Sequence, residues 1–352
     1  MGEGNASPVP AAGAAESGLV VKAAAQCYDG RVKRAAWIVA IVGLFCLLGI
    51  AFCGVLAFVS GHHPMPKWVG NNPPGGLEVL NAPEARYRVG VLGDAQKVLA
   101  NLANVVRTVQ KEEVAFMLQT GDLVSTNDEG HFRLVALTLG RAGLSVPMVV
   151  VPGNHDLKGG SERFYLEIGD LETRFRRGRV AFVAINNASG RPPPERALDE
   201  ALRGLLPEYA VVLAMHVPPF DAAGGVQKGY EPFLEWLAKS GVKYLLCGHV
   251  HGYFKKQVGA ATVIVNGVGG DYDAWQFGQT VHATILEIDG ASITDRAIEL
   301  PPEHGVWENV EHLAIGHVAE AYRRHPVPSW GGTLLLAALT GLAIGVLRLK
   351  RP

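Results

Sequence analysis

Two short segments of this sequence combine glycine with side chains that bind metal ions. They read Gly153-Asn154-His155-Asp156 and Gly248-His249-Val250-His251. Each follows an aliphatic run typical of a buried strand, and imidazole nitrogens and amide oxygens are ligands of borderline divalent metals. The two segments therefore predict a metal site built on turns at the ends of strands.

Other polar residues occupy the same kind of position. Asp94 and Gln96 follow one strand-like run, Asp122 follows a second and His216 a third. In open α/β sheets, ligands gather beyond the carboxyl ends of the strands. One Asp or His in such a place is usually part of a turn, but six residues placed alike predict a single rim: Asp94, Asp122, Asn154, His216, His249 and His251.

The order of these segments resembles the calcineurin-like metallophosphoesterase superfamily, from about Arg86 to Ile298. The resemblance implies a four-layer α-β-β-α sandwich with mixed sheets and a two-metal centre at their edge. It also implies that Asp122 bridges the two metals and that His155 donates a proton to the leaving group, steadied by Asp156. The implied ligands of the first metal are Asp94, Asp122 and His251, and those of the second are Asp122, Asn154, His216 and His249.

Gln96 departs from the family pattern, which usually has His two residues after the first Asp. An amide oxygen can ligate a metal, but it binds a transition metal less tightly than imidazole does. We count Gln96 among the metal ligands. The substitution leaves three outcomes open: a weakened first site, a changed metal preference, or a mononuclear and inactive centre.

The ligand set indicates two divalent ions from the group Mn, Fe, Zn and Co, because nitrogen and oxygen ligands without thiolate suit these better than calcium. Two such ions can activate a water and clamp the attacking and leaving oxygens of a phosphoester. The sequence thus predicts hydrolysis of a phosphomonoester or phosphodiester. The alternatives are a degenerate domain that binds a phosphorylated ligand or partner, and a structural domain without metal.

Two uncharged stretches predict membrane-spanning helices, which need about 20 apolar residues. They are residues 35–59 and 330–347, with 25 and 18 residues. Basic residues outside both stretches predict that the two termini are cytoplasmic and that the domain between them is extracytoplasmic. Arg323 and Arg324 lie on the opposite side of the second stretch and weigh against this orientation. A membrane tether makes a lipid-linked phosphate a candidate substrate.

The chain between these stretches alternates strand and helix patterns and, after Gly252, continues as consecutive antiparallel strands. This order predicts a layered α/β domain with mixed sheets. The expected segments are a disordered tail (1–34), a transmembrane helix (35–59), a linker (60–85), the metallophosphoesterase domain (86–300), a juxtamembrane helix (301–329), a second transmembrane helix (330–347) and a tail (348–352).

Neither the net charge nor the remaining histidines predict a further binding site. The 32 Lys and Arg balance 33 Asp and Glu without a basic block, so no nucleic-acid partner is expected. His304, His312, His317 and His325 form no i, i+4 pair, and we expect them to be surface residues. Asp128 and His131 follow Asp122 and are accounted for by the start of a helix.

Overall fold

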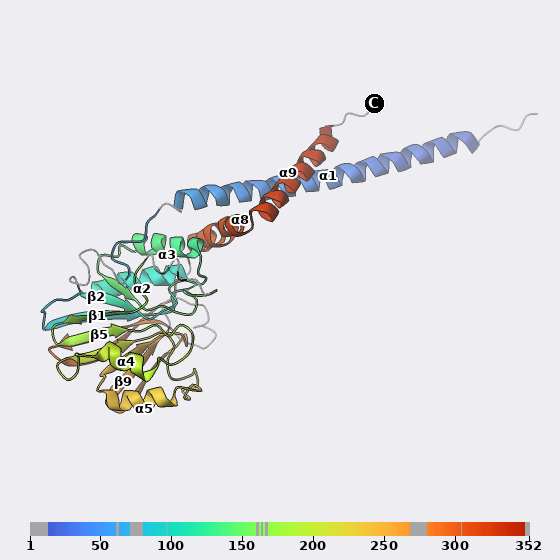
Figure 1. Ribbon diagram of the computed structural model, residues 1–352. Helices are drawn as coiled ribbons and strands as arrows, with labels where there is room; N and C mark the ends of the chain where they lie inside the picture. Colours follow the sequence, from blue (N-terminus) through green and yellow to red (C-terminus); the bar gives the residue numbers. More distant parts are fainter. Residues whose placement is uncertain are drawn as a thin grey trace, which may run out of the picture. The chain divides into compact units, whose positions relative to one another are not determined.

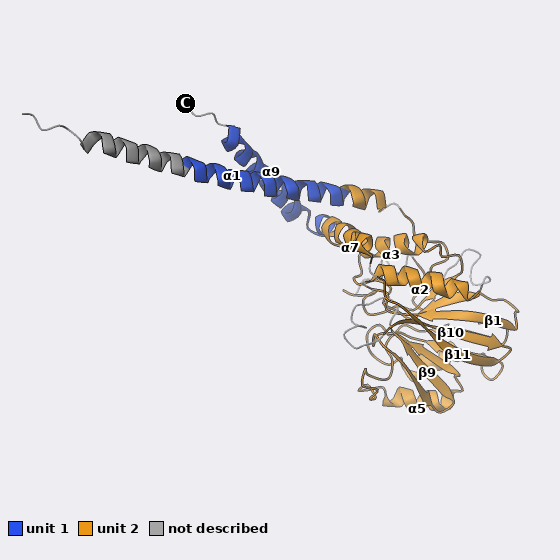
Figure 2. Cartoon of the chain, turned by 180° about the vertical axis from the view of Figure 1, so that it is seen from behind, with its two compact units in different colours: residues 1–54, 321–352 blue, residues 55–320 orange. Residues whose placement is uncertain are grey.

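The computed structural model divides the chain into two compact units (Figure 2). One consists of Met1–Gly54 and Ala321–Pro352, and the other is Val55–Glu320. The structure describes residues 13–60, 63–70, 80–96, 98–159, 162, 165, 168–267, 280–303 and 305–348.

The larger unit is built on two mixed β-sheets. The first contains, in spatial order, β11 (Ser292–Leu300), β10 (Val281–Asp289), β1 (Arg86–Leu92), β2 (Phe116–Gln119) and β3 (Met148–Val150). The second contains β4 (Thr173–Arg177), β5 (Val180–Ala184), β6 (Ala210–Ala214), β7 (Tyr244–Cys247), β9 (Ala261–Asn266) and β8 (Tyr253–Val258). The neighbours β1, β2 and β3 are parallel, as are β5, β6, β7 and β9.

Helices cover the outer faces of the two sheets (Figure 1). Helices α2 (Leu99–Lys111) and α3 (Glu129–Arg141) lie on the side of the first sheet, and α4 (Glu195–Leu202) and α5 (Glu231–Ser240) lie on the side of the second. Gly90 of β1 permits a close approach of α2, because a Cβ there would meet Val109 at 2.2 Å. The unit is therefore the predicted α-β-β-α sandwich.

The main core lies between the sheets and follows from the alternation of side chains along each strand. In β5, Phe182 faces the first sheet, where its ring packs edge-on against Phe116 with 5.0 Å between centroids. Its neighbours Ala181 and Val183 face the other way and pack with Leu198 of α4. Both faces of this sheet are therefore apolar, because one face packs against the first sheet and the other packs against helices.

The structure agrees with the predicted layered α/β domain and differs from the expected strands in two places. Strand β4 (Thr173–Arg177) was not predicted, because its Arg side chains hide the alternation of the buried Phe175. The strands after Gly252 do not form one antiparallel series: β8 and β9 join the second sheet, where β9 is parallel to β7, whereas β10 and β11 join the first.

The smaller unit is helical. Helix α1 (Gly13–Ser60) begins well before the expected span, so the backbone of residues 13–34 is helical rather than a disordered tail. Helix α9 (Pro326–Arg348) contains the second uncharged stretch. Asp29–Ser60 and Pro326–Arg348 are long and apolar enough to cross a membrane. The two helices touch through small residues, since a Cβ on Gly43 would collide with Thr340.

Candidate metal centre

The six predicted ligands at strand ends come together at one rim of the larger unit. The parallel neighbours β1, β2 and β3 of the first sheet lead into Asp94, Asp122 and Asn154. The parallel neighbours β6 and β7 of the second sheet lead into His216 and then His249 and His251. Each sheet therefore contributes half of the set, and the site lies where the carboxyl ends of both sheets meet.

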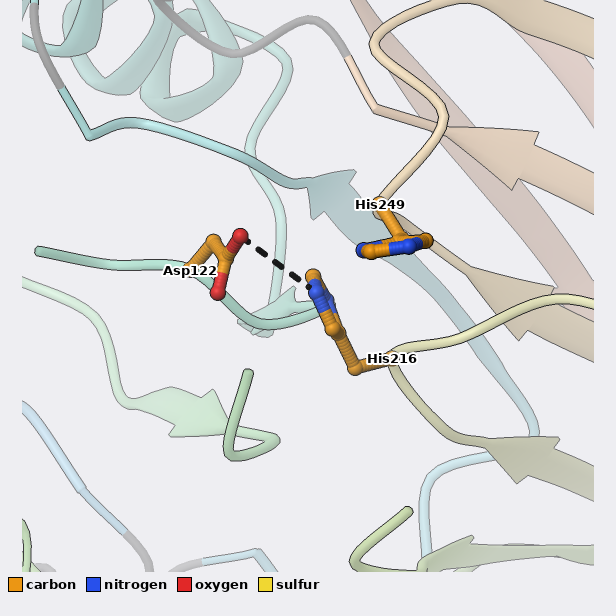
Figure 3. Close-up of side chains that lie close together, drawn as sticks. All are labelled: Asp122, His216 and His249. Carbon is orange, nitrogen blue, oxygen red and sulfur yellow. Dashed lines mark ion pairs between the residues drawn. The ribbon is translucent and has the colours of Figure 1, made fainter. Parts of the chain in front are cut away.

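The side chains form two groups that share Asp122. In one, the donor atoms of Asp122, His216 and His249 lie within 4.8 Å of one another (Figure 3). In the other, Asp94, Asp122 and His251 satisfy the same limit. Within these groups, His216 Nε2 lies 3.4 Å from Asp122 Oδ2, and His251 Nε2 lies 3.5 Å from Asp94 Oδ1. The implied division into two sets bridged by Asp122 fits this arrangement.

Asn154 belongs to the first of these groups. Its Oδ1 lies 3.0 Å from His216 Nε2 and 3.0 Å from His249 Nδ1. Metal–ligand bonds of about 2.0–2.2 Å place neighbouring ligand atoms about 2.9–3.5 Å apart. One carboxylate, one amide oxygen and two imidazole nitrogens thus already have the spacing of a coordination shell, and the residues present fit a divalent metal.

The backbone at the ligands is in an uncommon conformation. Asp94, Asp122, His249 and His251 have φ of 51°, 55°, 72° and 53°, which is the left-handed region. Such residues cluster at functional sites because the surrounding structure must hold them there. Gly153 is required for a different, steric reason, because a Cβ there would lie 2.2 Å from the carboxylate of Asp122.

Carbonyl and amide groups orient His216. Its Nδ1 donates to the carbonyl oxygen of Thr120 at 2.9 Å, which directs Nε2 toward the ligand set. Its backbone N–H donates to Asn187 Oδ1 at 2.9 Å, and Asn187 also accepts from Val217 N. Sequence reasoning missed Asn187, although it too follows a strand, β5, and the same positional rule would have found it.

The charges at the rim are strongly coupled. Burial favours the neutral form of His216, but the negative charges of Asp122 and Asp94 outweigh it and raise the pKa of His216 to about 9. Burial raises the pKa of Asp94. Burial and the neighbouring His216 lower the pKa of His249 to about 4. Without metal, a proton on His216 therefore offsets the buried carboxylates, and a bound cation would take its place.

Gln96 is buried beside the shared carboxylate. Its Nε2 donates to Asp122 Oδ2 at 2.5 Å. Its Oε1 is buried and has no hydrogen-bond partner among the described residues. A buried carbonyl oxygen without a partner is costly, and a metal ion at the first position would remove that cost. This orphaned oxygen is the observation that supports Gln96 as a ligand.

Replacing Gln96 by histidine is expected to strengthen metal binding at the first position, because imidazole is a better donor than an amide oxygen. Calorimetric titration of the metal-stripped protein with Mn or Zn measures the metal affinity. The dissociation constant of the second binding step should be lower in Gln96→His than in the wild type. A Gln96→Glu variant is the matched control for size, with an added charge. Unchanged affinity and stoichiometry in Gln96→His would show that residue 96 is not a ligand.

His155 lies next to Asp122. Its hydrogen bonds in the described part of the chain go to Asp122 and Ser125, whereas the family resemblance implies that Asp156 steadies it. Its backbone N–H donates to Asp122 Oδ1 at 2.8 Å, and its ring Nδ1 donates to the carbonyl oxygen of Ser125 at 2.8 Å. Asp156 is fully buried and accepts from the backbone N–H groups of Val124 and Gly153. Among the described contacts, Ser125 therefore orients the ring, and Asp156 fixes the two loops that carry Asp122 and Asn154.

Comparison with known proteins places the domain in a family. The model of the calcineurin-like phosphoesterase family matches residues 87–253. A probable cyclic nucleotide phosphodiesterase from Rhodopseudomonas palustris is 24% identical over an alignment of 184 residues. The alignment covers 47% of this chain and 66% of that protein. The purple acid phosphatase from yellow lupin (Lupinus luteus) seeds shares the fold with a TM-score of 0.51 and 13% identity, over 62% of this chain and 52% of that one.

The match to the family model runs from β1 to the start of β8 and includes every strand that leads into one of the predicted ligands. The family model and the geometry of the rim therefore agree on the same segment. The domain that contains Asp94, Asp122, Asn154, His216, His249 and His251 belongs to the calcineurin-like phosphoesterase family.

Proposed function

We propose that this chain hydrolyses a phosphate monoester or diester at the rim, with two divalent ions and with His155 as the general acid. Asp94, Gln96, Asp122 and His251 would hold one ion. Asp122, Asn154, His216 and His249 would hold the other. When bound, the ions supply positive charge to the phosphoryl oxygens and acidify a water, which is the chemistry that phosphoester hydrolysis needs.

The observation that carries this proposal is the double role of Asp122. Its carboxylate belongs to both ligand groups, and its Oδ2 lies 3.4 Å from His216 Nε2. Its Oδ1 accepts the backbone N–H of His155 at 2.8 Å. One carboxylate therefore fixes the ligand set and the residue that would act on the leaving group, so that the two are aligned with each other before substrate arrives.

His155 has the hydrogen bonding of a proton donor. Its Nδ1–H is engaged by the Ser125 carbonyl, so the proton that can be transferred is the one on Nε2. The carbonyl acceptor at Nδ1 fixes the orientation of the ring, so that this Nε2–H can donate to the departing ester oxygen. The side chain is half-buried, so it is reachable by a substrate in the rim while its backbone stays fixed.

We also propose that α1 and α9 anchor the domain to a membrane with both termini cytoplasmic and the domain outside. Both helices expose large apolar side chains, such as Phe45 and Leu342, over most of their length. Basic residues flank the outer ends of both spans, at Arg31 and Lys33 before the first and Arg348 after the second. A site tethered in this way favours a phosphoester carried on a lipid, which is the substrate class to test beside soluble esters.

The test is an assay of the detergent-solubilised protein on p-nitrophenyl phosphate and on bis(p-nitrophenyl) phosphate. The protein is stripped with a chelator and then supplied with Mn, Fe, Zn or Co. We expect the stripped protein to be inactive, and we expect turnover to return when metal is supplied again. Metal bound without turnover on either ester, or on a lipid phosphate in mixed micelles, would favour a phospho-ligand binding domain instead.

A further inference from the structure

A second group of histidines lies outside the ligand set of the rim. It consists of His131 in α3 and of His312 and His317 in η3 (His312–Ala319), which we call the histidine cluster. Helix η3 continues α7 (Val306–Glu311), which lies beside α3 (Figure 2). His131 is buried and His312 is half-buried, so the expectation that the histidines of this helix are all surface residues is wrong for His312.

The three rings are close together. His131 Nε2 and His312 Nε2 are 3.3 Å apart. The ring centroids are separated by 5.3 Å for His131 and His312, 4.9 Å for His312 and His317, and 6.0 Å for His131 and His317. Three imidazoles from two helices thus surround one small volume at the surface of the unit, where His317 is exposed.

The irregular form of η3 explains why the two histidines meet. Residues 312–319 form a π-helix, in which hydrogen bonds join residues five apart, and His312 and His317 have that spacing. In an α-helix, residues five apart point about 140° away from each other around the axis. π-Helices are rare and are frequently found at functional sites. The conformation therefore brings the two rings to one side of the helix.

The approach of η3 to α3 is close because of Gly316. A Cβ at this position would meet His312 Cδ2 at 2.8 Å and His131 Nε2 at 3.3 Å. A bidentate ion pair also joins the two segments, where Arg141 at the end of α3 binds Glu311 through bonds of 2.6 and 2.8 Å. The contact that brings His131 and His312 together is thus held by packing and by charge.

Asp128 gives His131 the orientation of a metal ligand. Its Oδ1 accepts from His131 Nδ1 at 2.7 Å, while it also caps α3 by accepting the backbone N–H of His131. With Nδ1 donating to a carboxylate, the lone pair of His131 is on Nε2, which points at His312. Histidines that bind metals usually have such a carboxylate at the other nitrogen, which fixes the tautomer and raises basicity.

We propose that the histidine cluster binds a zinc-class divalent ion through His131, His312 and His317, with Asp128 behind His131, and that this ion ties η3 to α3. Zinc–nitrogen bonds of about 2.0–2.1 Å separate two tetrahedral ligand nitrogens by about 3.3–3.4 Å and their ring centroids by about 5 Å. The distances of the cluster match these values for His131 and His312. The exposed His317 completes the set by rotation of its side chain.

The charge state supports the same assignment. Burial, together with the neighbouring His131 and His317, lowers the pKa of His312 to about 4. His312 is therefore neutral at physiological pH, which is the form that ligates a metal. The ion would join the juxtamembrane helix to the start of α3, directly after the loop that contains Asp122 and Ser125. This site does not depend on the proposed hydrolysis.

The experiment counts zinc in the full-length protein. The detergent-solubilised chain is stripped, reloaded with zinc alone and desalted, and zinc per chain is measured by elemental analysis. We expect the double variant His312→Gln/His317→Gln to hold one equivalent less than the wild type. His325→Gln, which removes an exposed histidine outside the cluster, should keep the full content.

Two further measurements keep the result decisive. His317→Gln alone changes an exposed side chain, so it should fold normally and bind zinc at this position about tenfold or more weakly in chelator competition. Cobalt in the wild type should show the intense visible absorption of a tetrahedral ion, and the double variant should lose the share of it that this site contributes. Equal zinc content and equal cobalt spectra in folded variants and wild type would mean that His131 and His312 share only a hydrogen bond. Loss of one equivalent without any phosphoesterase activity would retain this site and reject the proposed function alone.

Discussion

Replacing Asp122 by alanine is expected to remove phosphoester hydrolysis and to release metal from both positions at once. Asp122 is the one residue shared by the two ligand groups, and it also holds the backbone of His155. Metal ions contribute several kcal/mol to such reactions, so the loss should be on the order of a thousandfold or more in kcat/KM. Elemental analysis and the p-nitrophenyl assays measure both effects on the same preparation.

Two variants make the Asp122 result interpretable. Asp122→Asn keeps the size and the acceptor for His155 N–H but removes the charge, so activity should fall while the fold is kept. Asp289→Ala removes an aspartate whose partner at the surface is Arg86, and it should behave as wild type. A folded Asp122→Ala protein that keeps two metals and its rate would rule out the shared-ligand arrangement.

Replacing His155 by alanine is expected to slow hydrolysis without changing metal content. General acid catalysis is worth about 10²–10⁴-fold in rate. The loss should depend on the leaving group: it should be largest for alkyl phosphates, which need a proton on the departing oxygen, and small for p-nitrophenyl esters, whose leaving group departs as an anion. A series of aryl and alkyl esters measures this as a steeper dependence of kcat on leaving-group pKa in His155→Ala.

The contrast between esters separates an acid from a structural residue. A variant that merely loosens the loop would slow all esters alike and would lose metal. His63→Ala, which changes an exposed histidine outside the site, is the matched control. Equal losses across the ester series would assign His155 to positioning, through its bond to Asp122, rather than to proton transfer.

The gathering of these polar side chains at the rim could be predicted from the sequence because one local rule covers them. Asp94, Asp122 and His216 each follow a short apolar strand, and the carboxyl ends of parallel strands must meet at one edge. The rule needs no knowledge of how the strands pair. The rule also covers Asn187, which follows β5, but its contact with the backbone of His216 joins distant parts of the chain and could not be predicted.

The pairing of strands and the histidine cluster could not be predicted in the same way. Alternation identifies the strands β9 and β10, but it does not say that one joins the second sheet and the other the first. The spacing of His312 and His317 separates them on an α-helix, and only the π-helical conformation brings them together. Both features depend on packing against elements far away in the sequence, which local patterns do not encode.

The left-handed backbone of Asp94, Asp122, His249 and His251 limits how far this domain can be stabilised. Each such residue costs on the order of 1–3 kcal/mol relative to a relaxed conformation. Glycine would relieve that cost at all four positions, and it would delete a donor atom each time. Aspartate and histidine are among the few residue types that tolerate this conformation and can also bind a metal. An engineer who seeks a more heat-resistant form must therefore leave these positions alone and work on the opposite ends of the strands.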